Sequence, residues 1–449
     1  MPPTPKRSHF STQHITSILY GIQRISIILA TWLKRSVWGL TLVFLRAINY
    51  LKKQKLDRIL AIVVFAISIV ILLANYVFLG SYNFEGSLTV REMSFTYTGQ
   101  TEKLFLNTIR SIQNLDFQGK QPQALVLTGK FSSKSDPVLN QKLTQLKQLT
   151  IELPHATSRL ILTPANRNKS ELSILELHLL PDSSVNQLAY EPKKTQLSLC
   201  LQAASLPPDT CLFPEGLRDK FANPVGSLRV QLGQRALVVS LAGVNLPELN
   251  IRSDAEASEE LLLEVEPKND EFLLPLLTPT SLFIQLPVAK VAQSDANDVA
   301  EWFRRNLDVT HVNFSRLDTT GKVKDELQIS TILEGKVRMG AQVMELQPEQ
   351  FLIIPPKEVG IRRLRSIRIH PNSPQGLQTL ISGETRGIAV GLYPAFPVQK
   401  IEPSWLSKHI SQDAVNALLT FLGALNGILL PRLLPESPQK PDLSGNTKA

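Results

Sequence analysis

The residues of this chain best suited to binding chemistry are arginines gathered in one short stretch, 360–370 (GIRRLRSIRIH). The basic side chains of this stretch are Arg362, Arg363, Arg365, Arg368 and His370. Guanidinium groups bind carboxylates and phosphates through paired hydrogen bonds. We therefore regard the stretch as a candidate anion-binding site for an anionic lipid headgroup, a glycan or an acidic protein. The alternative is a solvated strand whose arginines pair with nearby acids.

The second chemical feature is a pair of cysteines, Cys200 and Cys211. Both lie at apolar strand ends, and the segment between them contains Pro207-Pro208-Asp209, which favours a turn. A turn there would bring the two side chains within the short separation that a disulfide requires. We predict a Cys200–Cys211 disulfide that persists in an oxidising compartment. Two buried free thiols are the alternative.

Catalytic and cofactor motifs are not found in the sequence. The seven histidines have no ligand-like spacing, and two cysteines cannot build a structural zinc site alone. Thr128-Gly129-Lys130-Phe131 lacks the glycine spacing of a phosphate-binding loop, and Ser382-Gly383-Glu384 lacks the glycine of a nucleophile elbow. We predict no enzyme, no metal and no cofactor, although a triad built from distant residues stays open.

The most prominent apolar segment of the chain is the uncharged run Ile59–Leu79. As a helix its 21 residues would measure about 31 Å, close to the thickness of a bilayer core of about 30 Å. We predict a transmembrane helix that anchors the chain to membrane lipids. The alternative is a buried core helix.

Charge predicts the orientation of this anchor. Ten Lys and Arg precede Ile59 against one acid, Asp57, so residues 1–58 carry +9, and the remaining 38 basic and 38 acidic residues cancel. Basic residues beside a span stay in the cytoplasm, so we expect a cytoplasmic N-terminus and an extracytoplasmic bulk. A neutral folded part argues against nucleic acid as a partner. A cleaved signal peptide is the competing interpretation, but it would need a shorter leader.

Two further segments have membrane character. The basic tail, 1–58, contains the short apolar runs Ile25–Leu33 and Val37–Leu45, which predict interfacial helices on anionic lipid or a small cytoplasmic hairpin. Near the other end, Ala414–Leu430 predicts an apolar helix with Asp413 in its first turn, ended by Pro431. This helix is a marginal second membrane span, and an amphipathic helix docked on the domain or lying on the outer leaflet would explain the same residues equally well. Residues 432–449 are expected to be disordered.

Between these segments, short apolar runs alternate with Pro, Gly, Asn and Asp, which is typical of β-strands. We predict a mainly β fold with antiparallel, sandwich-like sheets, an N-terminal transmembrane helix and a C-terminal apolar helix. Helical periodicity is convincing only at Lys103–Leu115 and Asp295–Leu307. The polar stretch Arg252–Glu260 is the expected boundary between β-rich domains at 85–252 and 260–405.

The segment Leu327–Pro355 predicts a strand, a tight turn and a second strand, with Gly335 and Gly340 at bends. A resemblance to uncharacterised membrane-anchored proteins of cyanobacteria lies in the runs Ser330-Thr331-Ile332, Gly335-Lys336-Val337-Arg338-Met339 and Gln350-Phe351-Leu352, with the later Gly383 and Gly391-Leu392-Tyr393. The resemblance implies a bacterial plasma or thylakoid membrane and no activity.

These observations lead us to expect a membrane-anchored protein whose extracytoplasmic β-rich module binds or scaffolds envelope components or a protein partner. A transmembrane sensor is the alternative, although no cytoplasmic output domain is recognisable. A membrane-bound hydrolase would need histidine and carboxylates converging in a cleft.

Overall fold

The computed structural model describes residues 57–76, 81–134, 136–206, 223–252, 260–268, 271–287, 302–318, 327–340, 342–355, 358, 360–370, 375–403, 410 and 412–429. The predicted interfacial helices of the tail, Cys211 and the C-terminal tail lie outside these residues. The chain divides into two compact units, Met1–Phe78 with Ile410–Ala449, and Leu79–His409. Each unit is described by itself.

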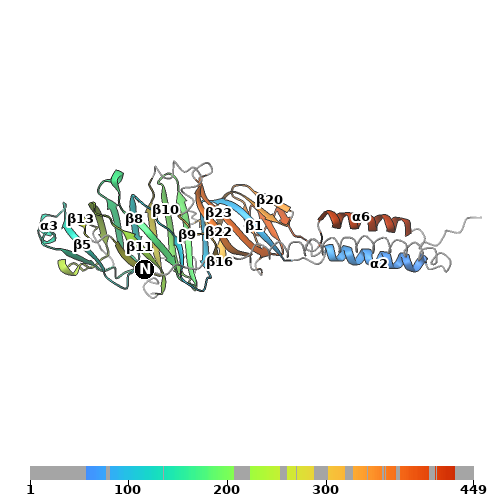
Figure 1. Ribbon diagram of the computed structural model, residues 1–449, viewed down its shortest axis with the longest axis horizontal. Helices are drawn as coiled ribbons and strands as arrows, with labels where there is room; N and C mark the ends of the chain where they lie inside the picture. The colour runs from blue at the N-terminus through green and yellow to red at the C-terminus, as the bar shows by residue number, and fades with distance from the viewer. Residues whose placement is uncertain are drawn as a thin grey trace, which may run out of the picture. The chain divides into compact units, whose positions relative to one another are not determined.

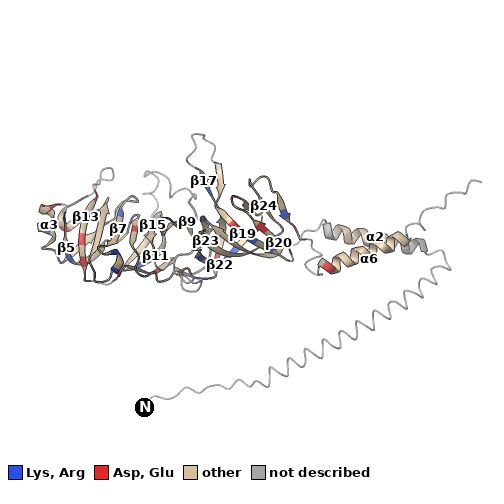
Figure 2. Cartoon of the chain, turned by 90° about the horizontal axis from the view of Figure 1, so that it is seen from above, with Lys and Arg blue, Asp and Glu red and all other residues tan. Residues whose placement is uncertain are grey.

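The first unit contains two helices, α2 (Asp57–Tyr76) and α6 (Gln412–Leu429), which lie side by side and antiparallel (Figures 1 and 2). The predicted C-terminal apolar helix is therefore present. Asn426 of α6 donates a hydrogen bond from Nδ2 to Oγ of Ser68 in α2 at 2.7 Å. Among the described residues, no helix combines the length and the hydropathy that crossing a membrane requires.

The second unit is built around one long antiparallel sheet (Figure 1). Its strands, in spatial order, are β20 (Gln342–Leu346), β19 (Ile332–Met339), β1 (Tyr82–Val90), β23 (Gly376–Thr385), β22 (Gly360–His370), β16 (Leu307–Asn313), β2 (Glu92–Tyr97), β9 (Ser183–Glu191), β10 (Gln196–Ala203), β15 (Thr280–Gln285), β4 (Asn114–Gln118), β7 (Arg159–Pro164), β12 (Leu237–Ala242), β13 (Leu261–Pro267), β5 (Leu125–Ser132) and β6 (Gln148–Ile151).

Smaller sheets and short helices complete this unit. The other sheets are β14 (Glu271–Leu277), β11 (Pro224–Gln231), β8 (Ser173–Leu179) and β3 (Lys103–Leu106); β21 (Phe351–Ile353), β24 (Ile388–Gly391) and β25 (Gln399–Ile401); and β17 (Ser315–Asp318) with β18 (Leu327–Ser330). The short helices are α3 (Pro137–Leu143), η1 (Arg167–Lys169) and η4 (Pro247–Leu249). Helix α3 begins where the Asp136 carboxylate accepts from the amides of Val138 and Leu139.

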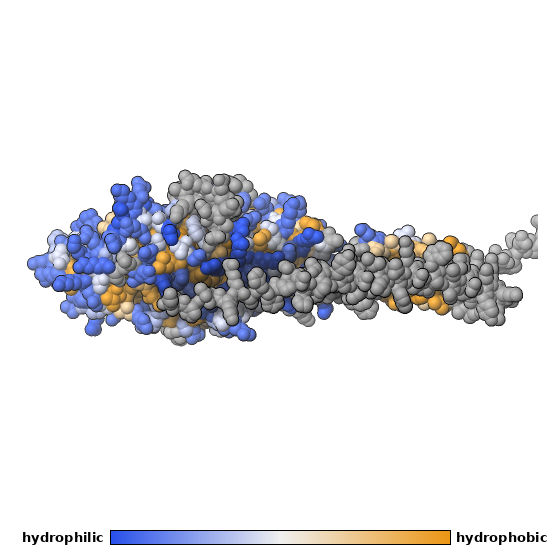
Figure 3. Space-filling model, viewed as in Figure 1, coloured by the Kyte–Doolittle hydropathy of each residue, from blue (hydrophilic) through white to orange (hydrophobic). Residues whose placement is uncertain are grey.

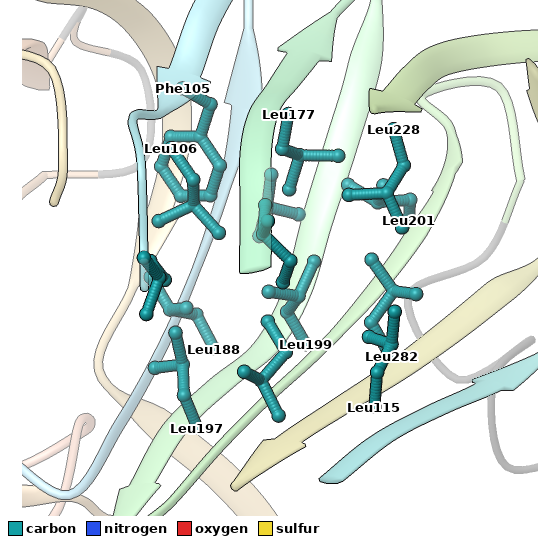
Figure 4. Packing of buried hydrophobic residues seen from close by; sticks show 14 of the residues in the cluster. Phe105, Leu106, Leu115, Leu177, Leu188, Leu197, Leu199, Leu201, Leu228 and Leu282 are labelled. Atoms are coloured by element: carbon teal, nitrogen blue, oxygen red, sulfur yellow. The ribbon is translucent and has the colours of Figure 1, made fainter. Parts of the chain in front are cut away.

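Alternation of apolar and polar residues explains why these segments form strands with one buried face. In β5 the side chains alternate between buried and more exposed positions along the whole strand. The buried faces meet in one hydrophobic core, in which leucines of β8 and β11 pack near leucines of β10 (Figure 4). Phe105 packs edge-to-face against Phe95 and Phe303, with ring centroids 5.8 and 5.4 Å apart. The expectation of a mainly β, antiparallel fold is confirmed.

Strand pairing corrects the domain boundary expected at Arg252–Glu260. The strands β13, β14 and β15 follow this stretch in sequence but pair with β12, β11 and β10, which precede it. At the other end of the sheet, β1 pairs with β19 and β23. The predicted regions 85–252 and 260–405 therefore share one sheet and one compact unit.

One predicted helix is wrong. Lys103–Leu115 forms β3, an isolated bridge at Ile109 and the start of β4. Apolar residues at positions 105, 106, 109, 112 and 115 have helical spacing, but all are buried against strands of the core. Tertiary pairing thus outweighed the local period. Of the second predicted helix, Asp295–Leu307, residues 302–307 are described and are not helical, and Leu307 begins β16.

The predicted hairpin in Leu327–Pro355 is confirmed. Strands β19 and β20 pair in antiparallel fashion, and Met339 lies opposite Gln342. Gly340 has a φ of 60°, a left-handed backbone that glycine adopts without strain.

Candidate functional site

The arginines of the predicted anion site lie on β22, between β23 and β16. Two register shifts, between Ile361 and Arg363 and between Leu364 and Ser366, interrupt the pairing of β22 with β23. These shifts are β-bulges or similar irregularities, and they let Arg362, Arg363 and Arg365 all be exposed within four residues. The local sequence thus places three guanidinium groups on the solvent side of the sheet.

Each of these three arginines forms an ion pair with a carboxylate from a different strand. Arg362 Nη2 lies 3.1 Å from Glu384 Oε2, and Arg365 Nη2 lies 2.7 Å from Glu85 Oε1. Arg363 donates from Nε to Asp308 Oδ1 at 3.1 Å. Pairing with nearby acids, the alternative to an anion site, is therefore present at all three positions.

A shallow pocket of about 280 Å³ lies over these pairs. It is lined by Asn83, Phe84, Glu85, Arg362, Arg363, Arg365, Ser382, Gly383 and Glu384. Its three arginines are balanced by Glu85 and Glu384 of the lining and by Asp308, which pairs with Arg363. Basic and acidic residues are interspersed among the strands in this part of the sheet (Figure 2). Such a surface is complementary to a polar ligand or partner that carries both signs of charge.

The remaining members of the predicted cluster lie further along β22. Arg368 is only partly exposed, and its buried Nε has no hydrogen-bond partner within the described part of the chain. His370 is the last residue of the strand and is partly buried. Neither residue lines the pocket, so the structure brings together three of the five predicted residues there.

The carboxylates of the pocket were missed by the sequence reasoning. Glu85 and Glu384 come from β1 and β23, and they reach the arginines because Glu85 lies opposite Ser382 and Asn83 lies opposite Glu384. The signal available in the sequence was their position on the polar side of alternating strands. That alternation predicts exposure of a side chain but not its partner.

A second polar cluster lies on the sheet formed by β3, β8 and β11. His178 has its Nδ1 3.5 Å from Glu102 and its Nε2 3.5 Å from Glu176, while Ser227 Oγ donates to Glu102 at 3.2 Å. In a catalytic triad the serine would donate to the histidine, whose other nitrogen would contact the acid. Here both ring nitrogens face carboxylates, so the cluster lacks the arrangement of a hydrolase site.

The remaining sequence predictions concern the cysteines, the metal ligands and the segment Thr128-Gly129-Lys130-Phe131. Cys200 is buried in β10 and is disulfide-bonded, whereas Cys211 lies outside the described residues, so the pairing of the two stays a prediction. Within the described ranges, no group of three His, Cys, Asp or Glu residues could hold a metal ion. Thr128-Gly129-Lys130-Phe131 lies in the middle of β5.

Gly335, Gly383 and Gly391 lie at close approaches to neighbouring segments of the chain. A Cβ at Gly335 would come within 2.3 Å of Leu88, one at Gly391 within 2.4 Å of the Phe396 carbonyl oxygen, and one at Gly383 within 2.1 Å of the Gly360 carbonyl oxygen. These positions have room for hydrogen only. The glycines therefore have a packing role.

The chain matches no protein-family model, and a comparison with curated proteins gave no match either.

Proposed function

We propose that this chain is a membrane-anchored protein whose extracytoplasmic β-rich unit binds or scaffolds a partner or an envelope component. The observation that carries this proposal is the apolar exterior of the helix pair. Large apolar side chains left exposed by α2 and α6 include Ile62, Val70, Phe421 and Ile428. Hydrophobic residues of the helix pair are visible beside the grey atoms in Figure 3. A helix that is apolar on all sides is stable when a protein core or lipid covers it. For this helix pair we propose lipid.

Charge supports the same interpretation. The charged residues of the two helices lie within the first two residues of each, at Asp57, Arg58 and Asp413. The excess of basic residues precedes Ile59, as expected for a cytoplasmic N-terminus. The membrane would be a bacterial plasma or thylakoid membrane if the cyanobacterial resemblance holds. The N-terminal basic tail would add contacts with anionic lipid.

The contact between the helices supports a second crossing. Ser68 Oγ donates to the Val64 carbonyl oxygen within α2 at 2.8 Å and accepts from Asn426 of α6 at 2.7 Å, so the hydroxyl uses both its donor and an acceptor site. Polar side chains that hydrogen-bond across helices are typical of helix pairs within lipid. Because α6 runs antiparallel to α2, a crossing by α6 would return the C-terminus to the cytoplasm.

Reporter fusions test this topology. A reporter active only outside the cytoplasm should be active after Gly226, and one active only in the cytoplasm should be active after Lys53. Reversed signals at these two points would refute the anchoring model. A fusion after Gly445 separates one crossing from two, and we expect the cytoplasmic signal there.

For the extracytoplasmic unit, we propose the pocket over β22 as the contact for the acidic group of a lipid headgroup, glycan or protein partner. Arg363 and Arg365 carry this interaction, because their guanidinium groups are half-exposed and keep donors free to share with a ligand. Exposed ion pairs contribute about 0–1 kcal/mol each, so a ligand carboxylate or phosphate can compete with the protein carboxylates.

The test compares the Arg363→Gln, Arg365→Gln double variant with wild type, using the full chain in phosphatidylcholine nanodiscs and heparin as an acidic probe. The Arg229→Gln, Arg235→Gln double variant is the matched control, because both of its arginines are half-exposed and also pair with glutamates. We expect weaker, less salt-dependent binding only in the first variant. Equal binding by all three proteins would exclude the pocket.

The hydrolase alternative has the cluster around His178 as its best site, and the hydrogen bonds there do not match a triad.

A further inference from the structure

An apolar surface lies at the connection between β24 and β25. Four large apolar side chains are exposed within seven residues of sequence, namely Leu392, Tyr393, Phe396 and Val398, the last two at 73% and 77% of their full area. Elsewhere in the described part of the second unit, exposed large apolar residues are scattered along the sequence. We call residues 392–398 the apolar tip. A cluster of this kind marks an interaction surface.

The backbone holds the apolar tip in a defined shape. Phe396 donates its amide hydrogen to the Tyr393 carbonyl oxygen at 3.0 Å, which closes a turn over Pro394 and Ala395. Val398 in turn donates to the Val390 carbonyl oxygen at 2.7 Å. Proline at the second position of a turn restricts the chain before any partner arrives. The aromatic side chains are therefore presented on a preformed turn.

The apolar tip continues onto the edge strand β20. Val398 and Val343 line the same cavity of about 390 Å³, whose other lining residues are Glu345, Gln347, Gln350, Val390 and Gln399. Val343 is itself exposed. Strands β20 and β24 lie at the same end of the second unit in Figure 2. The apolar tip and the exposed Val343 thus lie at the same end of the sheet.

The chain enters and leaves the second unit near this surface. Glu85 pairs with Arg338, which pairs with Val343, so Val343 lies two strands from Glu85, about 10 Å away. Glu85 is three residues from Tyr82, the first residue of β1. On the exit side, the apolar tip leads directly into β25, which ends at Ile401.

Short connections limit how far this end of the sheet can move from the helices. Only residues 77–81 separate α2 from β1, and this segment can extend to about 20 Å. Residues 402–411 separate β25 from α6, and their full extension is about 40 Å. If the helices are in a bilayer, these two connections keep the end of the sheet that carries the apolar tip within about 20–40 Å of the bilayer surface.

We propose that the apolar tip and Val343 insert into the headgroup region of the bilayer that anchors the chain. This inference rests on the membrane anchoring proposed above. Tyrosine favours this region because its ring is apolar and its hydroxyl group can hydrogen-bond to water or headgroups. Residues 391–398 contain no acidic residue, and Glu345, which lines the shared cavity, is paired with Lys336 at 2.9 Å. Insertion would fix the tilt of the sheet on the membrane.

The test measures contact between the tip and lipid. The full chain carrying Ala395→Cys, labelled with an environment-sensitive fluorophore under non-reducing conditions, is reconstituted into phosphatidylcholine–phosphatidylglycerol vesicles that contain nitroxide-labelled lipid. The matched control is Val138→Cys, an exposed apolar position on α3. We expect at least threefold stronger quenching and a blue-shifted emission at position 395. Adding Phe396→Ser and Val398→Ser should remove that difference.

Three outcomes would overturn the inference, and they are distinguishable. If the chain stays on vesicles through an alkaline carbonate wash but both labels are quenched equally, the tip does not insert and anchoring stands. If the label at 395 shifts to the blue without lipid quenching and in proportion to protein concentration, a second copy covers the tip instead. If the wash removes the chain, the proposed anchoring fails as well.

Discussion

The hydrogen bond between Asn426 and Ser68 allows a quantitative test of the helix pair. Replacing Asn426 by Leu keeps a side chain of similar size and removes the only donor that reaches Ser68 from α6 among the described residues. Ser68 keeps its bond to the Val64 carbonyl oxygen, so the substitution leaves no buried hydroxyl without a partner. The loss should therefore reflect the contact between the helices alone.

The expected magnitude follows from this geometry. A net intramolecular hydrogen bond contributes about 0.5–1.5 kcal/mol, and bonds between helices in lipid average about 0.6 kcal/mol. Because Ser68 is already satisfied, we expect a value near the lower end, about 0.6 kcal/mol, as the coupling energy in a cycle of Asn426→Leu and Ser68→Ala. That energy changes the ratio of paired to separated helices by about threefold.

The assay is a titration of the full chain in lipid bicelles with a denaturing detergent, followed by energy transfer between fluorophores placed on α2 and α6. Asn416→Leu is the matched control, because Asn416 lies on the same helix but is exposed. The control should leave the pairing unchanged or strengthen it. A coupling energy within error of zero, or an equal loss from both Asn substitutions, would refute the reasoning.

Three further predictions concern the β-rich unit. Burial raises the pKa of the Glu92 carboxyl group in the folded state. The folded state therefore binds the carboxyl proton more tightly than the unfolded chain does, and stability falls as pH rises from the unfolded-state pKa to the folded-state pKa of Glu92. In urea titrations, Glu92→Gln should stabilise the unit at pH 7 and have no effect below about pH 4, and equal effects at the two pH values would contradict this reasoning. Gly383→Ala should cost about 2–3 kcal/mol because its Cβ would lie 2.1 Å from a backbone oxygen. Gly340→Ala, which has open space but a positive φ, should cost about 1 kcal/mol, and similar losses in denaturant melts would disprove the packing argument. If Cys200 and Cys211 are bridged, thiol labelling of the denatured, unreduced chain should find no free thiol, and two reactive thiols would exclude the bridge.

The apolar and charged patterns of the sequence were sufficient to predict several features. The strands of the β-rich region, the apolar helix near the C-terminus and the hairpin of β19 and β20 follow from local periodicity and turn residues. These features depend on residues close in sequence, where steric preferences and the spacing of apolar side chains act directly. The charge asymmetry around Ile59 is likewise a property of the sequence alone.

Tertiary structure decided which strands pair and which charges meet. The partners of the arginines on β22 come from β1, β16 and β23, and β1 is more than two hundred residues away in sequence. Alternation of apolar and polar residues along the sequence places a side chain on one face of a strand, but it does not specify which strand lies beside it or in which register they pair. The same limit explains the incorrect helix at Lys103–Leu115, where apolar spacing fits a helix and the core instead selects two strands. It also explains the incorrect domain boundary, because the long-range hydrogen bonds that join both halves into one sheet leave no local signal in the sequence.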